Sequence, residues 1–198
     1  MILLSGSGNG SDFQSLVARL SGQRTLSRCL QCGKCTAGCP AAFAMDYKPN
    51  QIIRLLQLGR KNEVLGSRAI WTCSGCWTCT TRCPCNIDIA QIMDSLRVMA
   101  RQEGKTQQGR SVVLFNDLFL QSVRRHGRVF EFGIAAGFNL RRGKPFLDAE
   151  LGKFMLTRGK LRLTAERIKG AKEIRRLFSR TEVSSNDSAL NPEERARA

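Results

Sequence analysis

Eight of the nine cysteines in this chain of 198 residues fall into two copies of one spacing. Each copy reads C-x2-C-x2-C-x3-C-P, a pattern whose thiolates typically bind a [4Fe-4S] cluster. The first copy contains Cys29, Cys32, Cys35 and Cys39 and ends at Pro40; the second contains Cys73, Cys76, Cys79 and Cys83 and ends at Pro84. Two copies predict two clusters, and two neighbouring clusters form a path for electrons. The chemistry that these residues indicate is therefore one-electron transfer.

Structural zinc and disulfides are the two alternatives for these cysteines. Zinc sites more often take their ligands from two separated C-x2-C pairs or from mixed Cys and His. The single histidine, His126, lies far from both runs in the sequence. Three cysteines within seven residues would pair poorly as disulfides, and the chain does not begin with a signal peptide. We therefore favour two clusters over zinc, and zinc over disulfides.

The fourth cysteine of each run can be assigned in two ways. In proteins with two such runs, the fourth cysteine of each run ligates the cluster of the other run. This rule predicts that one cluster is held by Cys29, Cys32, Cys35 and Cys83. The other cluster would be held by Cys73, Cys76, Cys79 and Cys39. We prefer this crossed arrangement to a sequential one, in which each run holds its own cluster.

Three further residues lie close to the second run. Cys85 is either a redox thiol beside a cluster or a small buried apolar residue, and we prefer the second because free cysteine is among the most buried residue types. Trp71 and Trp77 bracket the run, and we expect both to shield the cluster from water rather than to carry electrons. No residue is assigned a catalytic role, and His126 is expected in a surface loop.

The segments around both runs show helical periodicity. Ser11 and Asp88 each precede a Gln by three residues and are predicted to be N-caps. Helices are expected over residues 11–20, 52–58, 61–67 and 89–99. No stretch alternates cleanly between apolar and polar residues, so the sequence predicts an all-α fold in which two cluster-binding loops are set between helices.

Beyond Gln102 the chain changes character. Further helices are expected over residues 111–123, 128–139 and 164–178, whereas residues 145–156 are ambiguous. Apolar side chains cover most of the first of these helices, and we expect it to be buried. The predicted domains are a cluster domain over residues 1–105, a helical extension for partner docking over 106–180 and a disordered polar tail over 181–198.

The net charge of +16 is concentrated in the C-terminal half, since residues 101–198 hold twenty-one basic and eleven acidic residues. Such a surface could attract an acidic protein, an anionic membrane or nucleic acid. We give equal weight to an ordinary solvated surface and to an acidic partner, and less to nucleic acid. No apolar stretch reaches the length of a membrane span. Reduced thiols without an export signal lead us to expect a cytoplasmic protein.

The cluster loops resemble those of one known family. The first loop, Cys29–Pro40, closely resembles the first cluster loop of the C subunit of heterodisulfide reductase, and the segment from Trp71 to Asp88 is similar to its second loop. The helical spacer between the runs resembles the α-helical ferredoxin domain, which is also found in iron–sulfur subunits of succinate dehydrogenase and in glycolate oxidase. The resemblance extends over residues 11–180.

This resemblance implies a relay subunit within a hetero-oligomer. In that family, the A subunit carries flavin and further iron–sulfur clusters, and the B subunit cleaves a disulfide substrate at CCG motifs. The C subunit passes electrons between them through two [4Fe-4S] clusters. The present sequence has no CCG motif and no Gly-rich nucleotide fingerprint, so we expect it to transfer electrons without acting on a substrate.

Two other functions are compatible with the residues. The chain could be the iron–sulfur subunit of another dehydrogenase that feeds a quinone pool through a membrane partner. It could also be a cluster-bearing protein that binds nucleic acid with its basic half. The second is less favoured because no helix-turn-helix or groove with interleaved aromatic residues is recognisable.

Overall fold

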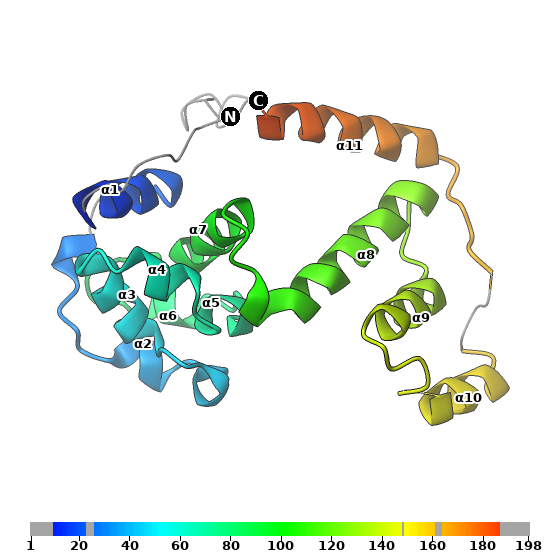
Figure 1. Cartoon of the computed structure of the whole chain (residues 1–198), viewed down its shortest axis with the longest axis horizontal. Coiled ribbons are helices and arrows are strands. Elements are labelled where there is room, and N and C mark those ends of the chain that lie inside the picture. Colours follow the sequence, from blue (N-terminus) through cyan, green and yellow to red (C-terminus); the bar gives the residue numbers. More distant parts are fainter. Residues whose placement is uncertain (1–9, 23–25, 148, 161–163, 187–198) are drawn as a thin grey trace. The chain divides into compact units, whose positions relative to one another are not determined.

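The computed structural model describes residues 10–22, 26–147, 149–160 and 164–186. These residues form helices, turns and connecting loops, and they contain no strand (Figure 1). The predicted all-α class is confirmed. None of the helices in the described part of the chain is both long and apolar enough to cross a membrane. The chain divides into two compact units, with the boundary between Arg110 and Ser111.

The N-terminal unit consists of short helices that precede, separate and follow the two cysteine runs. They are α1 (Gly10–Leu20), η1 (Leu26–Arg28), α2 (Lys34–Ala37), η2 (Ala42–Ala44), α3 (Pro49–Gln57), α4 (Lys61–Leu65), α5 (Ala69–Thr72), α6 (Thr78–Thr81), α7 (Ile89–Gln102) and η3 (Gln107–Gly109). The four helices predicted in this region are all present. The two cysteine runs, which the sequence suggested were loops, each contain a helix of one turn, α2 or α6.

Helix α7 is the centre of this unit, because α1, α4, α5 and α6 all contact it. Its inner face consists of fully buried side chains, among them Ile92, Leu96 and Met99. Burying one such side chain contributes about 2 kcal/mol. The Asp88 carboxylate caps the helix by accepting a hydrogen bond of 3.0 Å from the backbone N–H of Gln91, as predicted. The packing of α7 therefore positions the end of the second cysteine run.

Asp46 connects the end of the first run to the beginning of the second. Its carboxylate accepts hydrogen bonds from the backbone N–H groups of Arg68 at 2.7 Å and Ala69 at 2.8 Å, where α5 begins. Burial acts to raise the pKa of Asp46, but these bonds and one from Tyr47 outweigh it and hold the pKa below its ordinary value. The ionised carboxylate thereby fixes the position of α5, which leads directly into Cys73.

The described residues of the C-terminal unit form four helices. They are α8 (Arg110–His126), α9 (Glu131–Arg141), α10 (Ala149–Thr157) and α11 (Ala171–Asn186). The segment over 145–156, which the sequence left ambiguous, is largely the helix α10. The predicted tail is wrong for residues 181–186, which continue α11 because no glycine or proline interrupts the helix there. Residues 187–198 lie outside the described part of the chain.

The last helix begins at Ala171 and not at Thr164, so the prediction of its start is wrong. The backbone N–H of Ile168 donates to the carbonyl of His126 at 3.2 Å. Glu166 forms an ion pair with Arg128 at 3.0 Å. These contacts with the end of α8 and the loop after it hold the segment before Ala171 in a non-helical conformation, whereas its local sequence would allow a helix.

The C-terminal unit has almost no core. Among its described residues only Ile134 and Asn139 are buried. Helix α9 covers one side of α8, where the rings of Phe115 and Phe138 meet edge to face at 6.0 Å. Phe119 and Leu120 of α8 remain 38% and 48% exposed. Within its own unit, α8 is therefore covered on one side, and burial of its remaining apolar side chains against the cluster domain or at an interface stays a prediction.

The contact between Gly109 and Trp71 generates a stability prediction. A Cβ atom at residue 109 would lie 2.1 Å from Cδ2 of Trp71, whose side chain is buried. We expect Gly109→Ala to lower the free energy of unfolding by about 1–3 kcal/mol through overpacking. The measurement is the urea midpoint of the full chain, followed by circular dichroism. Gly152→Ala in α10 is the control, because no atom lies within 4 Å of the added methyl group; equal losses for both variants would contradict the prediction.

Candidate iron–sulfur centres

The eight cysteines of the two runs line two cavities in the N-terminal unit. The Cys39 cavity is lined by the thiols of Cys39, Cys73, Cys76 and Cys79. The Cys83 cavity is lined by the thiols of Cys29, Cys32, Cys35 and Cys83. Each cavity thus combines three cysteines of one run with the fourth cysteine of the other. All nine cysteines of the chain are free thiols.

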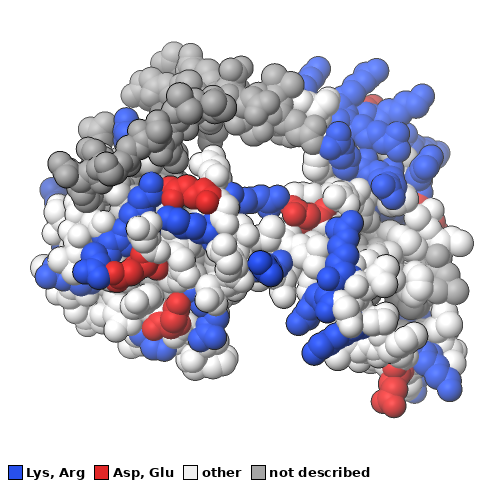
Figure 2. Space-filling model, in the orientation of Figure 1, with Lys and Arg blue, Asp and Glu red and all other residues white. Residues whose placement is uncertain are grey.

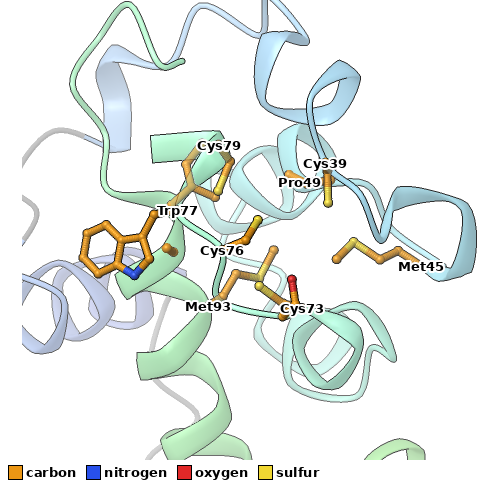
Figure 3. A pocket seen from close by; sticks show the side chains of 11 residues that line it. Cys39, Met45, Pro49, Cys73, Cys76, Trp77, Cys79 and Met93 are labelled. Atoms are coloured by element: carbon orange, nitrogen blue, oxygen red, sulfur yellow. The ribbon is translucent and has the colours of Figure 1, made fainter. Parts of the chain in front are cut away.

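Figure 3 shows how the Cys39 cavity is assembled. Cys73, Cys76 and Cys79 surround it from the second run, and Cys39 faces them from the end of the first run. The crossing depends on the contact between α2 and α6, the short helices inside the two runs. Each fourth cysteine lies two residues beyond the end of its short helix, so pairing the helices brings each one to the opposite cavity.

The two runs have the same backbone conformation. Gln31 and Gly33 adopt left-handed φ values of 54° and 73°, and the matching residues of the second run, Gly75 and Trp77, have values of 64° and 62°. A left-handed conformation costs a residue with a Cβ atom about 1–2 kcal/mol. Glycine avoids this cost at one of the two positions in each run, at Gly33 in the first and at Gly75 in the second. The strain at Gln31 and Trp77 is therefore sustained by the surrounding structure.

A threonine after the third cysteine anchors each run to the next long helix. Thr36 Oγ1 accepts from the backbone N–H of Asn50 at 3.3 Å, near the start of α3. Thr80 Oγ1 accepts from the backbone N–H of Ala90 at 3.2 Å and donates to the Asp88 carboxylate at 2.9 Å, at the start of α7. These equivalent bonds make the two runs an internal structural repeat.

The remaining lining differs between the two cavities. The Cys39 cavity is completed by Met45, Pro49, Ser74, Trp77, Ile89, Ala90 and Met93. The Cys83 cavity is completed by Leu30, Gln31, Gly33, Lys34, Asn50, Pro84, Cys85 and Ile89. Ile89 lines both cavities and is only 3% exposed, so its buried side chain borders each of them.

Hydrogen bonds reach thiols of both cavities, among them those from Gly75 to Cys73 and from Thr80 to Cys79. The side-chain amide of Gln31 donates to Cys29 Sγ at 3.3 Å, and the backbone N–H of Ile87 donates to Cys83 Sγ at 3.4 Å. The thiol of Cys76 donates to Thr78 Oγ1 at 3.4 Å. Two of these bonds place N–H donors on sulfur atoms of the Cys83 cavity, where they would stabilise a thiolate.

Burial disfavours ionisation of several thiols. It raises the pKa of Cys79 to about 11, with a further contribution from the negative charge of neighbouring Cys73. Burial also raises the pKa values of Cys35 and Cys73. The exposed Cys76 differs, because its hydrogen bond with Thr78 lowers its pKa. A metal group that binds these thiols as thiolates must therefore supply the free energy that deprotonates them.

Several residues near the runs differ from their predicted roles. Cys85 is partly exposed and lines the Cys83 cavity, so its predicted burial is wrong; the turn through Asn86, which has a φ of 52°, holds it at the cavity wall. Trp71 packs against Gly109 and lines neither cavity, whereas Trp77 lines the Cys39 cavity but is 50% exposed. His126 ends α8 instead of lying in a loop.

The donor set fits a cluster. In the part of the chain that the structure describes, no group of three or more His, Cys, Asp or Glu side chains is placed to hold a single metal ion. A [4Fe-4S] cluster is a cube that takes four thiolates at its corners. Four cysteines around each cavity, supplied from short turns with left-handed residues, match that requirement.

The region that contains both cysteine runs matches a known protein family. Residues 25–87 match the family described as the 4Fe-4S dicluster domain. The helical fold and the paired cavities agree with that match. This segment of the chain is therefore similar to 4Fe-4S dicluster domains.

The relatives of this region have one name in common. The chain is 48% identical over 79 residues to the C subunit of the ferredoxin:CoB-CoM heterodisulfide reductase of Methanosarcina acetivorans. It is 35% identical over 86 residues to the C subunit of the H(2):CoB-CoM heterodisulfide,ferredoxin reductase of Methanothermobacter thermautotrophicus. A protein of Archaeoglobus profundus named for its likeness to the C subunit of heterodisulfide reductase is 31% identical over 83 residues. The predicted resemblance of the iron–sulfur region to this subunit is confirmed.

The matches are limited in length. They cover 40%, 43% and 41% of this chain, which is less than the predicted resemblance over residues 11–180. The aligned segments make up 32%, 46% and 44% of those relatives. The chain thus matches less than half of the length of each of these relatives, and the similarity concerns the iron–sulfur region.

The threonine anchors generate a second prediction. Thr80→Val keeps the shape of the side chain but removes the hydroxyl group that accepts from Ala90 and donates to Asp88. We expect a loss of about 1–3 kcal/mol in the free energy of unfolding, because a partly buried N–H group loses its partner. Thr81→Val is the matched control, since Thr81 is exposed and its hydroxyl donates to the carbonyls of Trp77 and Thr78 in its own turn. Urea midpoints measure both effects. An equal loss of stability in Thr81→Val and Thr80→Val would contradict the anchor assignment.

Proposed function

We propose that this chain is an electron-transfer subunit of a heterodisulfide reductase-like complex. The observation that carries the proposal is the pair of four-cysteine cavities that share Ile89 in their lining, in a region similar to the C subunit of heterodisulfide reductase. Such a domain offers two one-electron sites close together and no substrate site. The chain therefore connects a reductant to an oxidant without catalysing a reaction itself.

The proposed cofactors are two [4Fe-4S] clusters with crossed ligands. Cys29, Cys32, Cys35 and Cys83 would hold one of them, and Cys73, Cys76, Cys79 and Cys39 the other. The lining of the two cavities supports this assignment over a sequential one. When bound, each cluster supplies a site that gains or loses one electron. The protein's own residues would hold the sulfur atoms around each cavity, and Ile89 would border both clusters.

The C-terminal unit is proposed as the docking extension. Its described residues bury almost no apolar side chains, while Leu140, Phe146 and Leu151 are 69%, 82% and 60% exposed. Lys and Arg side chains gather over this unit with few carboxylates among them (Figure 2). A unit with so little core gains stability when a partner covers it. An apolar surface with a basic rim fits a partner that presents apolar residues among acidic ones.

The proposed partners are a flavin-containing iron–sulfur protein, the A subunit, and a CCG-motif protein that cleaves the disulfide, the B subunit. They would form a hetero-oligomer with this chain in the cytoplasm. The flavoprotein would deliver electrons and the CCG-motif protein would consume them. Neither nucleic acid nor a membrane is needed for this role.

Double cysteine variants test the ligand assignment. The intact chain, reconstituted without oxygen, should hold about eight iron atoms in two cubes of four. Cys39→Ser/Cys76→Ser removes two ligands of one proposed cluster and should leave about four iron atoms. Cys39→Ser/Cys32→Ser removes one ligand from each cluster and should leave almost none. Iron and sulfide analysis together with the visible absorption spectrum measure both variants.

The same experiment contains its own control. Cys85→Ser should retain about eight iron atoms, because Cys85 is outside both ligand sets. If Cys39→Ser/Cys32→Ser kept four iron atoms and Cys39→Ser/Cys76→Ser kept none, the ligands would be sequential and the crossed assignment wrong. Tightly bound zinc in place of iron in the intact chain would overturn the proposed function as a whole.

The docking surface is tested by co-purification from native cells. The tagged chain should bring down a flavoprotein and a CCG-motif protein. Phe146→Ser should weaken this association at least tenfold, because exposed aromatic residues often dominate the affinity of an interface. Val98→Ser on α7, where Val98 is 53% exposed in the cluster unit, is the control and should bind normally. A haem- or quinone-binding membrane protein in place of both partners would instead favour the quinone-linked dehydrogenase.

A further inference from the structure

The Cys83 cavity has one more thiol in its lining than the Cys39 cavity. Four cysteines line the Cys39 cavity. The five that line the Cys83 cavity are Cys29, Cys32, Cys35, Cys83 and Cys85. A [4Fe-4S] cluster takes four thiolates. One cavity therefore contains a thiol beyond the number that its proposed cofactor requires, and that thiol belongs to Cys85.

A single turn brings Cys83 and Cys85 to the same cavity. The backbone N–H of Asn86 donates to the carbonyl of Cys83 at 3.2 Å. This bond closes a four-residue turn with Pro84 at its second position, where proline is favoured. The first and third residues of the turn, Cys83 and Cys85, both line the cavity. The two sulfur atoms thus belong to the same short segment, and a small movement of the turn is sufficient to exchange them.

The first run has the same turn but no second thiol. The backbone N–H of Ala42 donates to the carbonyl of Cys39 at 3.3 Å, and Pro40 is again the second residue. The third residue is Ala41, which does not line the Cys39 cavity. The additional thiol is therefore present in only one half of the structural repeat, and the other half provides a matched comparison.

Cys85 also differs from a cysteine that only fills space in a core. Such a residue is normally buried, whereas Cys85 is partly exposed and is not part of a disulfide. Its position in a cavity with four other thiols is the position of a ligand. The backbone N–H of Ile87 donates to Cys83 Sγ at 3.4 Å, and this bond favours Cys83 as the ligand in the intact chain.

We propose that Cys85 is a reserve ligand of the Cys83 cavity, which binds iron in place of Cys83 when Cys83 is lost or chemically modified. The inference rests on the proposed function, because it requires a cluster in that cavity. In the exchange, the bond between iron and Cys83 Sγ breaks and a bond between iron and Cys85 Sγ forms. Cys85 releases a proton on binding and Cys83 takes one up when it is released unmodified. No electron is transferred, so the exchange needs neither an oxidant nor a reductant.

Iron content of reconstituted full-length variants tests the proposal. Cys83→Ala should keep about eight iron atoms, because Cys85 completes the ligand set. Cys83→Ala/Cys85→Ala should keep about four, because neither thiol remains. Cys39→Ala is the matched control: it removes the equivalent ligand from the cavity that has no fifth thiol, and it should also keep about four.

Alkylation provides a second measurement on the same proteins. Iodoacetamide under anaerobic conditions should label Cys85 in the intact reconstituted chain, since the other thiols hold iron. In Cys83→Ala we expect labelling of Cys85 to slow by about tenfold or more, because a thiolate bound to iron is no longer a free nucleophile. Labelling of Cys85 in Cys39→Ala should be unchanged. Peptide mass spectrometry locates and quantifies the label.

The results separate this inference from the proposed function. If the intact chain does not hold about eight iron atoms, the proposed function itself fails. If the intact chain does but Cys83→Ala keeps four or none, the reserve ligand is wrong and the proposed function stands. Equal iron in Cys83→Ala and Cys83→Ala/Cys85→Ala, or undiminished labelling of Cys85 in Cys83→Ala, would also contradict the inference.

Discussion

The structure of the N-terminal unit depends on one constraint: each four-thiol cavity needs a cysteine from both runs. The runs are forty-four residues apart in the sequence, so the chain between them must leave the first run and return beside it. Helices α3, α4 and α5 make this return, and their contacts with one another and with α7 close it. The Asp46 carboxylate fixes the point where the chain enters the second run. Folding of the unit and formation of the cavities are thus one process.

The two units differ in how completely they bury their apolar side chains. The N-terminal unit buries a continuous apolar core and uses it to hold turns that are strained at Gln31 and Trp77. The C-terminal unit keeps its apolar side chains near the surface among basic residues. A rigid unit suits electron transfer, because small changes in separation strongly affect the rate. An incompletely packed unit suits association, because its apolar area is still available to a partner.

Local signals in the sequence predicted most helices of the cluster unit. The periodicity of α7 and its capping residue Asp88 were both correct, since burial of one helical face and a cap bond within three residues are local properties. The prediction failed where distant contacts override local preference. Residues 164–170 are held by His126 and Arg128, although their local sequence would allow a helix. Cys85 lines a cavity because of a turn that its own residue type does not indicate.

The sequence by itself determined the chemistry: eight cysteines at a spacing that lets short turns present thiolates to a [4Fe-4S] cluster, in a helical context. That information is local, since the steric demands of a turn are met within a dozen residues. Only the tertiary structure decided which thiols line the same cavity and that Ile89 borders both cavities. These features arise where helices from distant parts of the chain pack together. The spacing of the cysteines within one run does not determine which residues of the other run lie opposite them.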